Sequence, residues 1–226
     1  MKEVHRIADW VHAHRWSVLL VSLLALLVIS PISDVFNRAD NVISPLAGVV
    51  FFAIAASTGL RRWTRRAMML LIAVWVVISV CTDGSGLFAG ESLVAPVLFL
   101  VIMGLVFLLV ARWMARISVV NAEALCAALC GYLIVGIFWA GLYALAQSVD
   151  AHAIVAQGKA TMEHGDLLYF SFTTLTTTGF GDLVPKNPTA RMWTVLEAVI
   201  GTFYNAIVIA RLVTLYGFKQ IQSAKE

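Results

Sequence analysis

Six apolar runs recur along this chain of 226 residues, and each is close to the roughly 20 residues that a helix needs to cross a lipid bilayer. Polar or glycine-bearing breaks such as "SDVFNRADN" and "TDGSGLFAGES" separate them. Hydrophobic residues make up 61% of the chain and charged residues only 13%, about half the share of roughly 25% in soluble domains. Because a water-soluble fold could not bury this much apolar surface, the sequence predicts an all-α membrane protein. The predicted spans are residues 16–33, 42–60, 65–82, 92–111, 118–147 and 189–217.

Positive charges alternate between the breaks, which predicts the orientation of the chain. Lys and Arg lie before the first run and after the second, fourth and sixth, whereas the first and third breaks are acidic. By the positive-inside rule, this pattern favours six crossings of a cell (inner) membrane with the N- and C-termini cytoplasmic. A cleaved secretory signal is disfavoured because no A-x-A-like site follows the first run, which ends at Pro31 and Asp34.

The segment between the last two runs contains a shorter apolar patch, "LLYFSFTTL". A patch of about ten residues cannot cross a bilayer, so it predicts a short re-entrant helix. Asp166 is its expected N-cap, and the helix should stop where the glycines of "TTTGFGD" begin. Irregular backbone at membrane depth is tolerated only where protein buries it or where it lines a water-filled path. One hairpin cannot enclose such a path, so several copies of the chain should surround an axis.

The glycine spacing of "TTTGFGD" indicates how such a path would be lined. A bare cation in a low-dielectric medium costs tens of kcal/mol, and rings of backbone carbonyls replace its hydration shell. The carbonyls of Thr177, Thr178, Gly179 and Phe180 are the expected ligands, because glycine permits the backbone angles that turn carbonyls inward. The Phe180 side chain would then point outward as a spacer. The alternative for this run is an ordinary glycine-rich hairpin turn.

"TTTGFGD" is similar to the selectivity-filter signature of the potassium-channel superfamily, Thr-x-Gly-Tyr/Phe-Gly-Asp. The resemblance covers residues 118–217 and includes the outer helix, pore helix, filter and inner helix in order. It implies a tetramer, in which three identical subunits join each chain and K+ is the permeant ion, with no cofactor and no enzyme chemistry. The filter would comprise Thr177, Thr178, Gly179, Phe180 and Gly181, with K+ at the first four of these and Asp182 at the outer mouth.

Thr178 departs from the family pattern, in which Val or Ile is commoner. It leaves open a non-selective monovalent cation channel of the same architecture. In the family, aromatic residues of the pore helix brace the filter, so Tyr169 is expected to hydrogen-bond to Asp182, with simple core packing as the alternative. Gly201 resembles the hinge of the inner helix, and close helix packing explains it equally well. Thr202 and Asn205 are expected to face a water-filled cavity or, alternatively, to hydrogen-bond between helices.

Three ionisable residues of the last two runs are functional candidates because intramembrane charges are rare. Glu197 should lie near the pore helix, where it either stays protonated or accepts hydrogen bonds. Glu123 and Arg211 fall at similar depth, which suggests an ion pair between the two helices; snorkelling of each side chain to the interface is the alternative. For proton sensing, Glu197, Glu123 and His164 are equal candidates.

The front half lacks the signature of a voltage sensor. The fourth run, "SLVAPVLFLVIMGLVFLLVA", has no cation, and Arg112 and Arg116 follow its end. A helix without charge gains almost nothing from the membrane field, so we expect weak or no voltage gating by this route. The basic break "RRWTRR" would contact anionic membrane lipids, and ordinary positive-inside topology is the alternative explanation for its charges. Nothing in the sequence indicates nucleic-acid binding, a metal site or an active site. The predicted organisation is an interfacial amphipathic helix (1–15), a four-helix membrane domain (16–116), a pore domain (117–218) and a short cytoplasmic tail (219–226).

Overall fold

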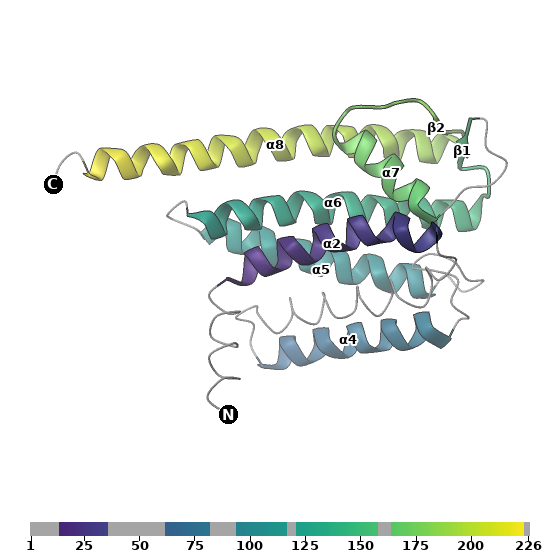
Figure 1. Ribbon diagram of the computed structural model, residues 1–226, viewed down its shortest axis with the longest axis horizontal. Helices are drawn as coiled ribbons and strands as arrows, with labels where there is room; N and C mark the ends of the chain where they lie inside the picture. Colours follow the sequence, from purple (N-terminus) through teal and green to yellow (C-terminus); the bar gives the residue numbers. More distant parts are fainter. Residues whose placement is uncertain (1–13, 36–61, 82–93, 117–120, 158–163, 224–226) are drawn as a thin grey trace.

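The computed structural model describes residues 14–35, 62–81, 94–116, 121–157 and 164–223 (Figure 1). Most of these residues are helical, and the long helices lie side by side along the long axis of the molecule. The helices are α2 (Arg15–Val35), α4 (Arg62–Cys81), α5 (Val94–Arg116), α6 (Ala122–Val149), α7 (His164–Leu175) and α8 (Pro188–Ser223). Two short strands, β1 (Ile154–Ala156) and β2 (Leu183–Pro185), flank α7 in the sequence.

Three of the described helices are long and apolar enough to cross a membrane. The stretches that qualify are Pro96–Arg116, Ala122–Val149 and Pro188–Arg211, and shorter apolar stretches occur at Trp16–Val28 and Arg66–Ile78. These helices indicate a membrane protein. The predicted span 42–60 and nearly all of the predicted interfacial helix 1–15 lie outside the described residues, so the count of six crossings stays a prediction.

Helix α6 is shared by two hydrophobic cores. One core joins it to α2, α4 and α5, and includes Trp75, Phe99 and Met103. The other joins it to α7 and the start of α8, and includes Tyr143, Phe170 and Leu175. The three described helices of the predicted unit 16–116 therefore share a core with α6.

Helix ends differ from the sequence prediction at several points. Helix α6 begins after Asn121, whose side chain accepts a hydrogen bond from the Ala124 N–H at 2.9 Å, as an N-cap residue does. The prediction of Asp166 as an N-cap is wrong, because α7 already begins at His164 and places Asp166 in its first turn. Arg62 begins α4, so most of "RRWTRR" belongs to a helix. Helix α8 continues to Ser223, beyond the predicted domain boundary at residue 218.

The strands β1 and β2 form an antiparallel pair that the sequence analysis missed. Their register pairs Ile154 with Pro185 and Ala156 with Leu183. The pair lies close to the end of α6 where α7 begins (Figure 1). It joins the segment before α7 to the segment after the glycine-rich loop, so the stretch that contains both α7 and this loop begins and ends at the strand pair.

Candidate functional site

The glycine-rich loop after α7, which we call the filter segment (residues 176–182), has an alternating backbone. Thr177, Gly179 and Gly181 have φ values of 58°, 51° and 79°, in the left-handed region. The Thr178 N–H donates to the Thr173 carbonyl at 2.8 Å and the Thr177 N–H to the Thr174 carbonyl at 2.9 Å. This pair of bonds is the Schellman cap that ends many helices, normally with glycine at the left-handed position. Here Thr177 occupies that position, at a cost of about 1–2 kcal/mol.

All carbonyls of the filter segment except that of Asp182 lack a backbone partner among the described residues. Within the described part of the chain, no backbone N–H donates to a carbonyl of residues 176–181. Every residue of the segment is exposed in the single chain. Since unpaired carbonyls are costly to leave away from water, this segment needs a ligand, water or another chain.

Three side chains of the filter segment make contacts within their own chain. The Phe180 ring stacks on the Tyr169 ring of α7, with centroids 6.2 Å apart and an interplanar angle of 6°. The hydroxyls of Thr176 and Thr178 lie 2.9 Å apart, and the Thr176 hydroxyl donates to the Phe172 carbonyl at 2.7 Å. The Thr178 side chain is therefore engaged within the chain.

The end of the filter segment is held by backbone and side-chain contacts. The Gln157 N–H, next to β1, donates to the Asp182 carbonyl at 2.7 Å. Partial loss of solvent and a hydrogen bond with the Asp182 carboxylate raise the pKa of Tyr169 above its ordinary value of 10.0. Nearby, the Asn187 amide donates to the Asp150 carboxylate at 2.8 Å. That hydrogen bond, followed by the one from the His152 N–H, lowers the pKa of Asp150.

The Tyr169 hydroxyl gives a direct test of the brace at Asp182. We expect Tyr169→Phe to keep the ring packing on Phe180 but to change the rate of slow current decay in reconstituted protein. Loss of this hydrogen bond should change the decay rate several-fold. Single-channel or macroscopic recordings of the two proteins measure the difference, and identical decay would reject the brace.

Helices α6, α7 and α8 contact one another in two layers that are one helical turn apart. In the first layer, the Tyr132 hydroxyl of α6 donates to the Leu175 carbonyl of α7 at 3.2 Å. A Cβ on Gly201 of α8 would lie 2.5 Å from the same carbonyl oxygen. Gly201 therefore permits close contact between α8 and the end of α7, as the packing interpretation expected, and its role as a hinge stays a prediction.

The second layer has a buried carboxyl group at its centre. Glu197 of α8 is completely buried, as is Ser171 of α7. The Tyr143 hydroxyl of α6 donates to Glu197 Oε2 at 2.6 Å. Ser171 Oγ lies 2.5 Å from Glu197 Oε1 and 2.8 Å from the Gly136 carbonyl oxygen. On each helix the residue of the second layer lies four positions from the residue of the first layer: Gly136 from Tyr132, Ser171 from Leu175, and Glu197 from Gly201. The same face of each helix therefore makes both layers.

Glu123 and Arg211 do not form the ion pair that the sequence suggested. The two carboxylate oxygens of Glu123 accept hydrogen bonds from the Trp16 N–H at 3.0 Å and the Ser17 hydroxyl at 2.5 Å. Glu123 therefore satisfies a free N–H in the first turn of α2, where a carboxylate is favourable.

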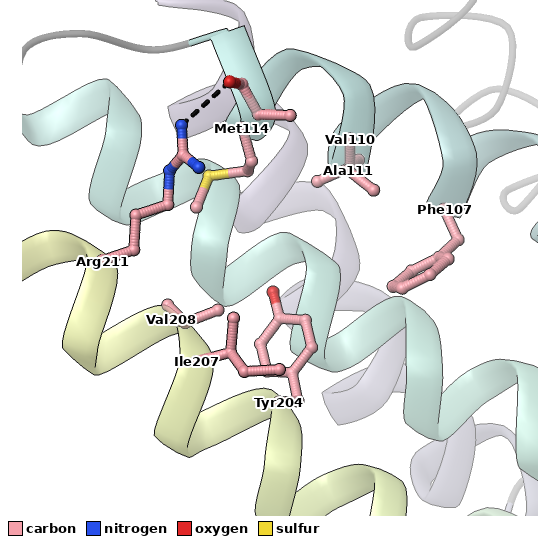
Figure 2. Close-up of a pocket in the computed structure, with 9 residues that line it drawn as sticks. Phe107, Val110, Ala111, Met114, Tyr204, Ile207, Val208 and Arg211 are labelled. Carbon is pink, nitrogen blue, oxygen red and sulfur yellow. Dashed lines mark hydrogen bonds between the residues drawn. The ribbon is translucent and has the colours of Figure 1, made fainter.

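Arg211 reaches α5. Its Nη2 donates to the Ala115 carbonyl at 2.9 Å, drawn as a dashed line in Figure 2. The side chain borders an apolar pocket of about 220 Å³ between α5 and α8, together with Phe107, Met114, Tyr204 and Ile207. The Tyr204 hydroxyl donates to the Ala128 carbonyl at 2.6 Å, so α8 is also attached to α6 here.

The residues expected to face a cavity are exposed on α8. Thr202 and Asn205 are both exposed in the single chain, and the Thr202 hydroxyl donates to the Ala198 carbonyl of its own helix at 2.9 Å. The same helix carries many exposed apolar side chains: Met192, Val195, Leu196, Val199, Ile200, Phe203, Ile207, Ile209 and Val213. A helix with so much exposed apolar surface needs lipid or another chain against it.

Helix α6, the short helix α7, the filter segment and the long helix α8 follow one another in the sequence. Residues 126–217 match the model of a family described as "Ion channel". The match supports an ion channel. It begins within α6, includes α7 and the filter segment, and ends within α8, so less than half of the chain is covered. No curated protein matches the chain.

Sequence reasoning missed the groups that fix α7. Hydrogen bonds to α7 and α8 come from Tyr132, Tyr143 and Ser171. Gly136 leaves room for the Phe172 ring, which would lie 2.7 Å from a Cβ added at Gly136. A serine within "LLYFSFTTL" was the available signal for a buried polar contact. Its partner could not be identified from spacing, because it lies 26 residues away.

Proposed function

We propose that this protein is a potassium-selective channel that conducts K+ passively through a pore formed by four identical chains. The observation that carries the proposal is the alternation of left-handed φ values at Thr177, Gly179 and Gly181. Such an alternation would direct successive carbonyls toward one side, and none of those from Thr177 to Phe180 accepts a backbone hydrogen bond within the described residues. Rings of such oxygens from several chains replace the hydration shell of K+.

The apolar and filter surfaces that a single chain leaves exposed support a tetramer. The filter segment and the apolar face of α8 are exposed in the isolated chain. Copies of α8 packed around one axis would cover this face and place the filter segments opposite one another. In this arrangement Thr202 and Asn205 would line the space below the filter, and Asp182 would border its outer mouth.

Flux measurements test the proposal directly. Purified protein in liposomes is expected to release K+ down its gradient with no energy source, and to pass Na+ far more slowly. Because α5 carries cations only toward its last turn, the flux should depend little on voltage. Protein-free liposomes and liposomes with the Gly179→Ala variant provide the controls. Absence of K+ flux from properly assembled protein would contradict the proposal.

The non-selective monovalent cation channel remains the second candidate, because Thr178 stands where the family usually has Val or Ile. The contact between the Thr178 and Thr176 hydroxyls supports potassium selectivity, because it leaves only the Thr178 backbone to face the ions. Equal Na+ and K+ flux would favour the second candidate. In that case Thr178→Val should increase the preference for K+.

A further inference from the structure

The contacts of Glu197 specify where the protons lie. Ser171 Oγ has two oxygen neighbours: the Gly136 carbonyl oxygen at 2.8 Å and Glu197 Oε1 at 2.5 Å. A serine hydroxyl has one proton, and a carbonyl can only accept. The Ser171 proton is therefore needed for the contact with Gly136, and the proton in the shorter contact must come from Glu197.

An ionised Glu197 does not satisfy the same contacts. It would take the single Ser171 proton and leave Ser171 Oγ and the Gly136 oxygen 2.8 Å apart with no proton between them. It would also place a charge at a completely buried position. Burying an unpaired charge costs several kcal/mol.

No cation compensates such a charge within the described residues. The groups that face Glu197 are Tyr143 from α6 and Ser171 from α7, and both side chains are uncharged at neutral pH. The nearest charged residues along α7 and α8 are Asp166, which is half-buried, and Arg191, which is exposed. The surroundings thus favour the neutral acid, as the hydrogen-bond pattern does.

We propose that Glu197 is a neutral carboxylic acid that joins α6, α7 and α8 and positions the filter segment. Its Oε1 carries the proton and donates to Ser171, which donates to Gly136, while Oε2 accepts from Tyr143. Ser171 lies one turn before Leu175, at which α7 ends and after which the filter segment begins. Glu197 is therefore a positioning residue that acts on the filter through α7. Its effect on conduction rests on the proposed channel function, whereas its protonation state does not.

Infrared difference spectroscopy of the full-length protein tests the protonation state. At pH 7 the wild-type protein should show the C=O band of a protonated carboxyl group, and Glu197→Gln should lack this band. In Tyr143→Phe the band should persist but move to higher frequency, because Oε2 loses its hydrogen-bond donor. Glu123→Gln is the matched control and should leave the band unchanged, because Glu123 accepts both of its hydrogen bonds from other groups. Absence of the band in wild type, or its survival in Glu197→Gln, would overturn the proposal.

Measurements of thermal stability and K+ flux distinguish a positioning role of Glu197 from a role in filling space only. Glutamine supplies a donor to Ser171 and an acceptor for Tyr143, so Glu197→Gln should unfold within a few degrees of wild type and conduct K+ at neutral pH. Glu197→Leu, which fills space without these bonds, should melt several degrees lower and lose most of its flux. At alkaline pH the wild-type flux should fall reversibly while the Glu197→Gln flux does not; equal pH profiles would reject the positioning role. If the infrared band behaves as predicted but wild-type protein shows no K+ flux, the channel proposal and the positioning role are overturned. The assignment of Glu197 as a neutral acid would still stand.

Discussion

Replacing Gly179 by alanine is expected to reduce K+ flux by at least about a hundredfold, because every chain around the pore would be strained. Gly179 has a φ of 51°, and nothing lies within 4 Å of an added Cβ, so the obstacle is backbone conformation and not steric contact. A side chain in the left-handed region costs about 1–2 kcal/mol per chain. If the residue relaxes to negative φ, the Thr178 and Gly179 carbonyls turn away from the axis and the ring of ligands is lost.

The same substitution at Gly104 is the matched control. Gly104 lies within α5, and the space around its added Cβ is equally open to 4 Å. Alanine is favoured over glycine inside a helix by about 0.5–1 kcal/mol, so Gly104→Ala should conduct normally and unfold no more easily than wild type. D-alanine at position 179 accepts positive φ and should preserve flux. Normal K+ flux in Gly179→Ala would show that the left-handed conformation is not needed.

Replacing Gly201 by alanine is expected to lower the thermal stability of the assembly and to reduce flux. The added Cβ would lie 2.5 Å from the Leu175 carbonyl oxygen and 2.9 Å from Leu175 Cδ1. The carbonyl belongs to the backbone and also accepts the Tyr132 hydroxyl, so α8 itself must move away from α7. Overpacking of this kind typically costs about 1–3 kcal/mol.

Thermal unfolding and flux together separate the two interpretations of Gly201. The packing interpretation predicts that Gly201→Ala melts at a lower temperature than Gly104→Ala and wild type, and conducts less. A hinge predicts unchanged melting and an altered open probability, because alanine stiffens a helix without straining its contacts. Unchanged melting of Gly201→Ala would contradict the close contact with Leu175.

The long helices were predictable because bilayer thickness sets their length. The glycines of the filter segment indicated backbone angles that other residues rarely adopt. The exact helix ends were less predictable. Arg62 and its neighbours look like a polar break, but long basic side chains are good helix formers, and α4 includes them. Thr177 has positive φ although threonine rarely adopts it, because the Schellman cap of α7 requires that conformation.

The contacts of the ionisable residues were beyond sequence reasoning. Equal depth suggested a partner for Glu123, yet its carboxylate binds Trp16 and Ser17, more than a hundred residues earlier. The three-residue strands β1 and β2 are too short to show an alternating pattern. Glu197 was recognised as a residue near the pore helix, but only the packing of α6, α7 and α8 brings Tyr143 and Ser171 to it.

Anomalous diffraction from crystals of the full-length protein grown in Rb+ tests the central claim most directly, because Rb+ substitutes for K+ and scatters strongly. The proposal predicts four chains around one axis, with Rb+ peaks on that axis between the carbonyl layers of residues 177–180. A monomeric chain, an axis without ions at this level, or carbonyls bonded within their own chain would contradict it.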